Sequence, residues 1–197
     1  GLERVFITGV SPVVLADMSS GYNVVVSIYR RGEFNDLCGF HESEIQIVLK
    51  QLAQEKGFSD AQVSLMLEIM KKFYNGYSFD EDQDNLVYNP TLALYFLEHL
   101  QRTGKYPKNL LDHNLAMDRS RLNYIARLPH GNEVIENALD EARDLFVPKI
   151  HDRFGVEDML NHEQRENELA SLLYYLGVLT LNGSTMLGEV KLRIPNL

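Results

Sequence analysis

The stretch from Phe73 to Phe96 constrains the fold of this chain most. It holds two aromatic turns joined by an acidic loop, Tyr74-Asn75-Gly76-Tyr77 and Val87-Tyr88-Asn89-Pro90, and then an apolar helix. Asn-Gly is a strong turn signal because glycine allows a positive φ or a close backbone approach. Asn before Pro favours an extended residue ahead of a helix. Two interpretations stay open: a rigid platform that contacts a ligand, or a helix cap, turn and capped helix packed by tyrosines.

Helical periodicity around this stretch predicts a mainly α fold. Glu42–Lys56 and Ala61–Phe73 form a predicted hairpin, with Gly57 as the stop of the first helix and Ser59 as the N-cap of the second. Apolar residues recur on both helices at three- and four-residue spacing, which indicates core rather than a cofactor site. Further helices are predicted over Glu33–Gly39, Pro90–Gln101, Asn109–Arg127 and Asn132–Phe146.

The two ends of the chain supply the β part of an α+β pattern. Val5–Ile7 is a short apolar run typical of a strand buried on both faces, and Val24–Tyr29 is a second β-prone run. No further run typical of a strand buried on both faces follows until the far C-terminus, so we expect an orphan N-terminal strand whose sheet is encoded upstream.

The C-terminal segment is predicted to be a helix followed by a β-hairpin. The helix covers Asn161–Leu176, and strands Val178–Leu181 and Leu187–Ile194 flank a turn at Asn182-Gly183. This order resembles the end of a winged-helix domain. Winged helices bind DNA through a basic recognition helix, whereas this helix carries Glu163, Glu166 and Glu168 against Arg165 alone. We therefore expect protein contact rather than direct nucleic-acid binding.

Composition indicates a soluble, cytoplasmic protein. The net charge of -9 opposes nonspecific attraction to phosphate backbones, and no apolar run is long enough to cross a membrane. The single Cys38 excludes an internal disulfide and favours a reducing compartment. The histidines lack the paired spacing of metal ligands, so no metal site is predicted.

Several motifs together resemble the bacterial family of predicted AAA-ATPase-like proteins. They span nearly the whole chain, in this order: Phe6-Ile7-Thr8-Gly9-Val10-Ser11-Pro12, Ser20-Gly21-Tyr22-Asn23, Glu33 to Phe40, Tyr74 to Phe79, Tyr88-Asn89-Pro90 and Leu192 to Asn196. The resemblance implies a P-loop ATPase core, then a helical region, often followed by a nuclease-like domain of the restriction-endonuclease type. This chain resembles only the middle and C-terminal part of the ATPase-like region.

The sequence contains no Gly-rich loop ending in Lys-Ser or Lys-Thr, and no apolar strand ending in paired acidic residues. The nuclease-like carboxylate and Lys motif is absent as well. The resemblance therefore implies ATP and Mg²⁺ only in the context of a missing P-loop core. The expected partners are that upstream core and a C-terminal nuclease-like domain, and homo-oligomerisation is left open. We expect no ATP hydrolysis by the chain alone.

The resemblance also implies the cofactor-binding residues. Thr8 and Ser11 would lie at the strand edge that senses the γ-phosphate, and Asn75, Gly76 and Tyr77 would form a lid turn over the nucleotide. From the residues alone, the favoured interpretation is that Thr8 and Ser11 satisfy local backbone groups around a turn before Pro12. No catalytic residue is predicted.

These observations divide the chain into three regions. Residues 1–40 are a remnant of the core edge and a connector, 41–128 a helical lid-like region, and 129–197 a winged-helix-like region. The favoured function is a nucleotide-sensing lid and winged-helix-like part of an AAA-ATPase-like protein. The alternatives are an interaction module that couples the ATPase to a nuclease-like domain, and a DNA-binding regulator.

Overall fold

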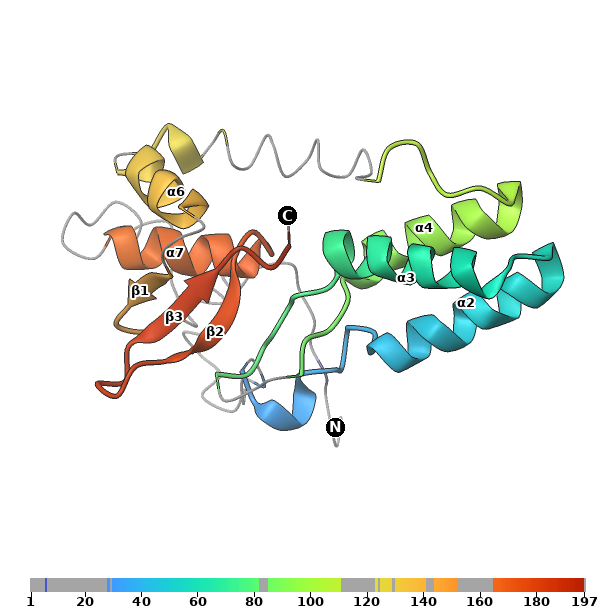
Figure 1. The fold of residues 1–197 in the computed structure, drawn as a ribbon. Coiled ribbons are helices and arrows are strands. Elements are labelled where there is room, and N and C mark those ends of the chain that lie inside the picture. Colours follow the sequence, from blue (N-terminus) through green and yellow to red (C-terminus); the bar gives the residue numbers. More distant parts are fainter. Residues whose placement is uncertain are drawn as a thin grey trace, which may run out of the picture.

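The computed structural model describes residues 30–81, 85–110, 125–128, 130–140, 144–151 and 165–196, together with positions 6, 28 and 123. Its elements form two groups, which Figure 1 shows side by side. The helical unit consists of α2 (Glu42–Lys56), α3 (Asp60–Tyr74) and α4 (Pro90–Thr103). The α/β unit consists of α6 (Gly131–Leu139), β1 (Leu145–Val147), α7 (Arg165–Tyr175), β2 (Thr180–Ser184) and β3 (Val190–Arg193). The predicted mainly α (α+β) class is confirmed.

Local capping explains where the helices of the first unit begin and end. α2 stops at Gly57, whose φ of 73° is left-handed, and the backbone N–H of Gly57 donates to the Ala53 carbonyl. Ser59 then caps α3, because its hydroxyl accepts from the backbone N–H of Gln62. α4 begins with Pro90 after Asn89, whose side chain accepts from two backbone N–H groups of the first turn. These caps are those that the sequence predicts.

The core of the helical unit lies where α2, α3 and α4 meet. The Tyr74 and Phe96 rings pack edge to face at 5.9 Å between centroids. The other fully buried side chains there include Ile45, Leu49, Met70 and Leu100. Val48 and Leu94, which the periodicity assigns to the apolar faces of their helices, are 36% and 54% exposed. They lie on the sides of α2 and α4 that face each other outside this core.

The α/β unit packs α6 and α7 with a three-stranded antiparallel sheet of order β1-β3-β2. Leu192 of β3 pairs with Leu145 on one side and with Leu181 on the other. The predicted helix Asn132–Phe146 is therefore wrong at its end, since the helix stops at Leu139. Leu145–Val147 is a strand because it pairs with β3, a partner far away in the sequence.

The hairpin turn also differs from the prediction. Asn182 and Gly183 lie within β2, where the pairing with β3 is irregular between Leu181 and Ser184. The chain reverses further on, where Gly188 N donates to Thr185 O at 2.9 Å. A bulge in β2 accommodates the Asn-Gly pair, so this pair marks an irregularity within the strand and not the turn of the hairpin. The helix-then-hairpin order is observed, and the winged-helix assignment stays a prediction.

Other expectations concern less regular parts. Glu33–Gly39 is not a helix, because only Gly32–Phe34 forms a 3₁₀ turn and Leu37 is 55% exposed. The buried side chain of this segment is Asn35, at 4%. The predicted strand Val5–Ile7, the run Val24–Tyr29 and the helix Asn109–Arg127 fall almost wholly outside the described residues. None of the described helices combines the length and apolar character that crossing a bilayer would require.

Candidate functional site

The residues that carry the resemblance converge where the helical unit meets the α/β unit. We call this region the joint and define it as residues 75–81, 85–89 and 193–196 together with Asn35 and Phe40. Figure 1 shows the two connecting segments that leave the helical unit and run toward the sheet. The joint includes three of the predicted cofactor-binding residues, Asn75, Gly76 and Tyr77. The other two, Thr8 and Ser11, lie outside the described residues.

Asn75 and Gly76 begin the joint directly after α3. Asn75 is 9% exposed, and its Oδ1 accepts from the backbone N–H of Gly76 at 2.7 Å. Gly76 has a φ of 115°, and a Cβ at this position would lie 1.6 Å from the carbonyl oxygen of Pro195. Only glycine allows the two backbones to approach so closely. The Asn-Gly signal therefore marks a contact between the end of α3 and the segment after β3.

Two short antiparallel bridges tie the joint together. Tyr77 and Val87 exchange backbone hydrogen bonds of 3.2 and 2.9 Å, and Phe40 and Tyr88 exchange bonds of 3.3 and 2.8 Å. The Asn89 N–H also donates to the carbonyl of Tyr74 at 2.8 Å. The second aromatic turn thus pairs with the first and with the segment before α2.

A buried hydroxyl contact connects the joint to the sheet. The Ser78 N–H donates to Thr180 Oγ1 at 2.7 Å, and that hydroxyl donates back to the Ser78 carbonyl at 2.9 Å. Ser78 and Thr180 are each 1% exposed. Leu181 N adds a longer bond of 3.4 Å to the same carbonyl. Because these groups are removed from water, losing the Thr180 hydroxyl would leave a buried N–H without its partner.

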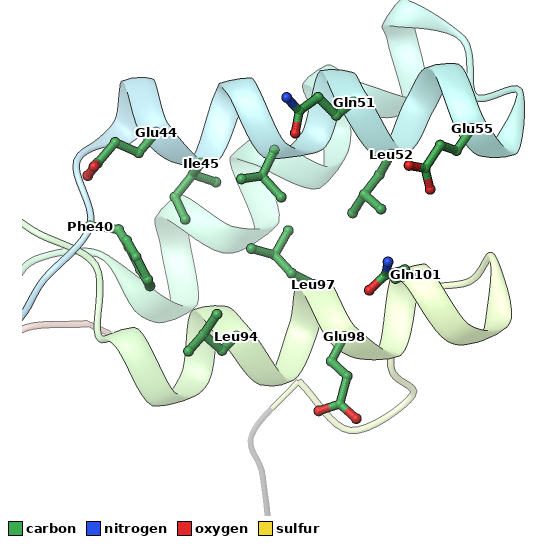
Figure 2. Close-up of a pocket in the computed structure, with 11 residues that line it drawn as sticks. Phe40, Glu44, Ile45, Gln51, Leu52, Glu55, Leu94, Leu97, Glu98 and Gln101 are labelled. Atoms are coloured by element: carbon green, nitrogen blue, oxygen red, sulfur yellow. The ribbon is translucent and has the colours of Figure 1, made fainter.

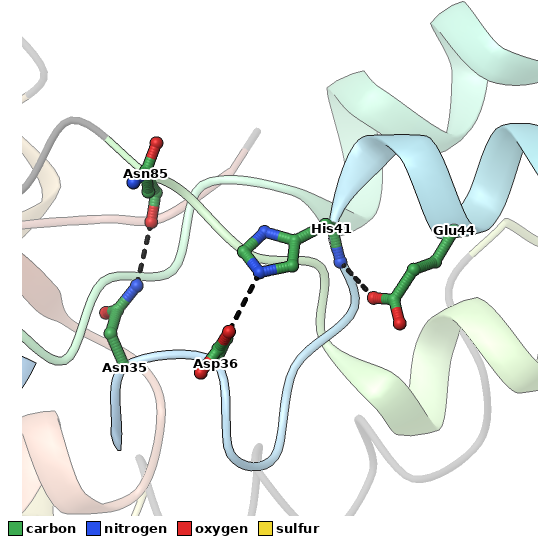
Figure 3. Close-up of polar contacts among 5 residues, drawn as sticks. All are labelled: Asn35, Asp36, His41, Glu44 and Asn85. Carbon is green, nitrogen blue, oxygen red and sulfur yellow. Dashed lines mark hydrogen bonds and ion pairs between the residues drawn. The ribbon is translucent and has the colours of Figure 1, made fainter. Parts of the chain in front are cut away.

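The side chain of Asn35, which precedes α2, makes two further hydrogen bonds within the joint. Its Nδ2 donates to the Asn85 carbonyl at 2.9 Å, and its Oδ1 accepts from the Phe79 N–H at 2.7 Å. One amide side chain therefore bridges both ends of the loop between Phe79 and Asn85. Figure 3 shows the Asn35–Asn85 contact beside two contacts of His41, one with Asp36 and one with Glu44.

Three titratable groups around the joint have pKa values that depart from their ordinary values. Burial raises the pKa of the Tyr88 phenol to about 12, with a smaller contribution from the Glu42 carboxylate. Burial likewise raises the pKa of Tyr74, whose hydroxyl donates to the Leu110 carbonyl. The pKa of Asp36 is lowered by its hydrogen bond with the His41 side chain. None of these three shifts moves a pKa toward 7, the position expected of a general acid or base.

The backbone N–H groups of Gly76 and Tyr77 are both used within the protein, so they are not free to bind a nucleotide phosphate. A phosphate needs free N–H donors or a free cation, but Gly76 N–H donates to Asn75. Arg30, the arginine near the acidic loop, pairs with Glu81 at 3.1 Å. Both Asn75 and Gly76 are also buried rather than exposed. Nucleotide contact by Asn75, Gly76 and Tyr77 stays a prediction, and this geometry favours packing.

One group of potential metal ligands lies in the α/β unit, outside the joint. His130, Glu133 and Glu166 each offer an atom within 4.8 Å of the others, and all three side chains are exposed. His130 Nδ1 lies 3.4 Å from Glu133 Oε2. The sequence shows the His-x-x-Glu spacing at the start of α6, but it does not show that α7 brings Glu166 to the same place.

Two contacts of the joint, Asn35–Phe79 and Ser78–Thr180, were not predicted because the two residues of each pair lie far apart in the sequence. Asn35 has no periodic or turn signal that marks it as buried, and Thr180 reads simply as a strand residue. Only the pairing of distant segments brings them together.

Comparison of the chain with family models, curated proteins and solved structures found no match.

Proposed function

We propose that this chain is a non-hydrolytic coupling module of a cytoplasmic AAA-ATPase-like protein. In this role it links an ATPase core to a partner domain, such as the nuclease-like domain that the resemblance implies. The observation that carries the proposal is the convergence of the resembling segments on the joint. Four of these segments lie far apart in the sequence but take part in one set of contacts at the joint. They are Glu33 to Phe40, Tyr74 to Phe79, Tyr88-Asn89-Pro90 and Leu192 to Asn196.

The physical basis of coupling is a connection that resists bending. The Gly76–Pro195 approach joins the units through backbone atoms, and the Ser78–Thr180 contact joins them through buried hydrogen bonds. Neither contact depends on long, freely rotating side chains. A displacement of the helical unit would therefore carry the α/β unit with it, because separate movement would expose unpaired polar groups.

Rigidity can be measured in the 197-residue chain itself. Spin labels would be placed at exposed Glu68 of α3 and exposed Met186 of the hairpin, after Cys38 is replaced by serine. Electron–electron dipolar spectroscopy should give a narrow distance distribution for the parent chain and a broad one for Thr180→Val. Thr103→Val, which removes an exposed hydroxyl at the end of α4, is the matched control. An unchanged distribution in Thr180→Val would contradict a stiff joint.

Coupling itself is tested in a protein that contains both the P-loop core and the partner domain. Thr180→Val should preserve ATP hydrolysis but abolish the effect of ATP on the partner domain. Loss of hydrolysis with intact folding would instead favour the nucleotide-sensing alternative. Intact ATP dependence in the variant would reject the coupling role.

A further inference from the structure

A groove runs between α2 and α4 on the helical unit. It has a volume of about 700 Å³ and is lined by eleven residues, shown in Figure 2. Its floor is apolar, with Ile45, Leu52 and Leu97 buried to 1%, 6% and 8% exposure. Val48 and Leu94 form apolar walls that are 36% and 54% exposed. An apolar surface of this kind between two helices gains free energy when a further apolar group covers it.

The rim of the groove carries negative charge. Glu44, Glu55 and Glu98 line it together with Gln51 and Gln101, and none of the lining residues is cationic. The Glu44 carboxylate accepts from the His41 N–H. Within the part of the chain that the structure describes, neither Glu55 nor Glu98 forms an ion pair. The groove therefore combines apolar contacts with carboxylates that lack a positive partner.

The orientation of α2 and α4 decides which end of the groove holds their C-terminal ends. In Figure 2 both helices run in the same sense, from the Phe40 end of the groove toward Glu55 and Gln101. Their C-terminal ends thus lie at the same end of the groove, where the helix dipoles place partial negative charge. Because Lys56 and Arg102 lie in the last turns of the two helices and offset this charge, positive charge on a ligand is favoured along the rim, by the glutamates.

We infer that this groove docks an amphipathic helix with a basic polar face from a protein partner. The lining of α2 from Glu44 to Glu55 spans roughly 16 Å, which is about three helical turns. Leucine-like side chains at three- and four-residue intervals would enter between α2 and α4, as in helix-in-groove recognition. Lysine or arginine side chains beside them would meet the three glutamates. This inference goes beyond the coupling role, because the groove lies outside the Ser78–Thr180 contact and either idea can fail alone.

The test uses the 197-residue chain and a fluorescein-labelled helical peptide of about 16 residues. The peptide carries leucines at three- and four-residue intervals and lysines on the flanks, and its control has every lysine replaced by glutamate. Fluorescence anisotropy should show saturable binding of the basic peptide, weakened by added salt because the pairs are at the surface. The acidic peptide should not bind.

Variants locate the binding to the groove. Leu94→Gln and Glu98→Lys should each weaken binding by about fivefold or more, because one removes an apolar anchor and the other reverses a rim charge. Leu65→Gln and Glu68→Lys make the same exchanges at exposed positions of α3 and should change binding by less than about twofold. Circular dichroism melting confirms that all four variants are folded.

Three results would overturn the inference. The first is failure of the basic peptide to bind, or equal binding of the acidic peptide. The second is unchanged affinity in Leu94→Gln and Glu98→Lys. The third is self-association in sedimentation velocity that Leu94→Gln abolishes, since the groove would then be an interface between copies of this chain.

Discussion

Gly76 shows at the scale of one residue how the two units are held together. Its φ of 115° and its contact with the Pro195 carbonyl are separate reasons for glycine at this position. The first is a property of the local backbone, which favours glycine in the left-handed region. The second exists only because the segment after β3 returns to the end of α3. The backbone effect and the steric effect can be separated by comparing substitutions at Gly76 and Gly104. Gly104 also has a positive φ, of 67°, but nothing lies within 4 Å of an added Cβ there.

Gly76→Ala should therefore lower the free energy of unfolding by about 2 to 4 kcal/mol, the sum of backbone strain and a steric clash. Gly104→Ala should lower it by about 1 kcal/mol, from backbone strain alone. Urea unfolding at constant pH measures both. Equal losses in the two variants would mean that the Pro195 contact contributes nothing to stability.

Asn75 and Tyr77 distinguish packing from nucleotide contact. Asn75→Ala leaves the buried Gly76 N–H without its acceptor, which should lower stability by about 1 to 3 kcal/mol. Tyr77→Ala removes a half-buried ring beside the backbone bridge to Val87 and should also lower the melting temperature. In a protein that includes the P-loop core, both folded variants should bind an ATP analogue as the parent does. Weaker nucleotide binding at unchanged melting temperature would instead establish the lid role.

At the scale of one element, the start of α2 links stability to pH. His41 is the N-cap residue of α2, and its Nε2 lies 3.0 Å from Asp36 Oδ2. This hydrogen bond lowers the pKa of Asp36 below its ordinary value of 3.8. Near that pH the unfolded chain binds more protons at Asp36 than the folded chain does. The stabilisation is therefore complete above the unfolded pKa and is lost as pH falls through the folded pKa.

Asp36→Asn tests this linkage. The variant should be less stable than the parent at pH 6, because the carboxylate contact is missing. The difference should shrink as pH falls below about 4, because Asp36 is then protonated first in the unfolded parent and, at lower pH, in the folded parent. Urea unfolding across this range provides the measurement, with Asp60→Asn, an exposed carboxyl at the start of α3, as the control. A difference that stays constant with pH would exclude Asp36 ionisation as its source.

Elements whose signals are local were predictable, and those that depend on distant partners were not. α2 and its stop at Gly57 follow from periodicity and a glycine cap within one stretch of sequence. β1 was predicted as part of a helix because its strand character comes from pairing with β3. The Asn182-Gly183 pair gave a correct signal of irregular backbone but the wrong kind of irregularity. The joint follows the same rule, since the sequence identifies its turn and not the Thr180 contact.

At the scale of the whole molecule, two packed units share one acidic chain. The helical unit has its own core between α2, α3 and α4, and the α/β unit has another around α7 and the sheet. The joint connects them through buried polar groups rather than through a continuous apolar core. Such a connection fixes geometry through buried hydrogen bonds, which suits a part that transmits movement.

The whole-molecule charge leads to a prediction on DNA. The net charge is -9, and the first turn of α7, the helix that precedes the hairpin, carries Glu166 and Glu168. Lys191 and Arg193 of β3 supply the nearest cations of the hairpin, and two phosphate contacts would release few counterions. We therefore expect duplex DNA to bind with a dissociation constant no lower than about 10⁻⁴ to 10⁻⁶ M at physiological salt, as for nonspecific binding.

A salt titration by fluorescence anisotropy checks this, with Glu166→Lys as a variant that should bind more tightly if α7 faces the duplex. Submicromolar affinity of the parent chain with a steep salt dependence would show that a local basic surface overrides the overall charge, and would restore the DNA-binding alternative.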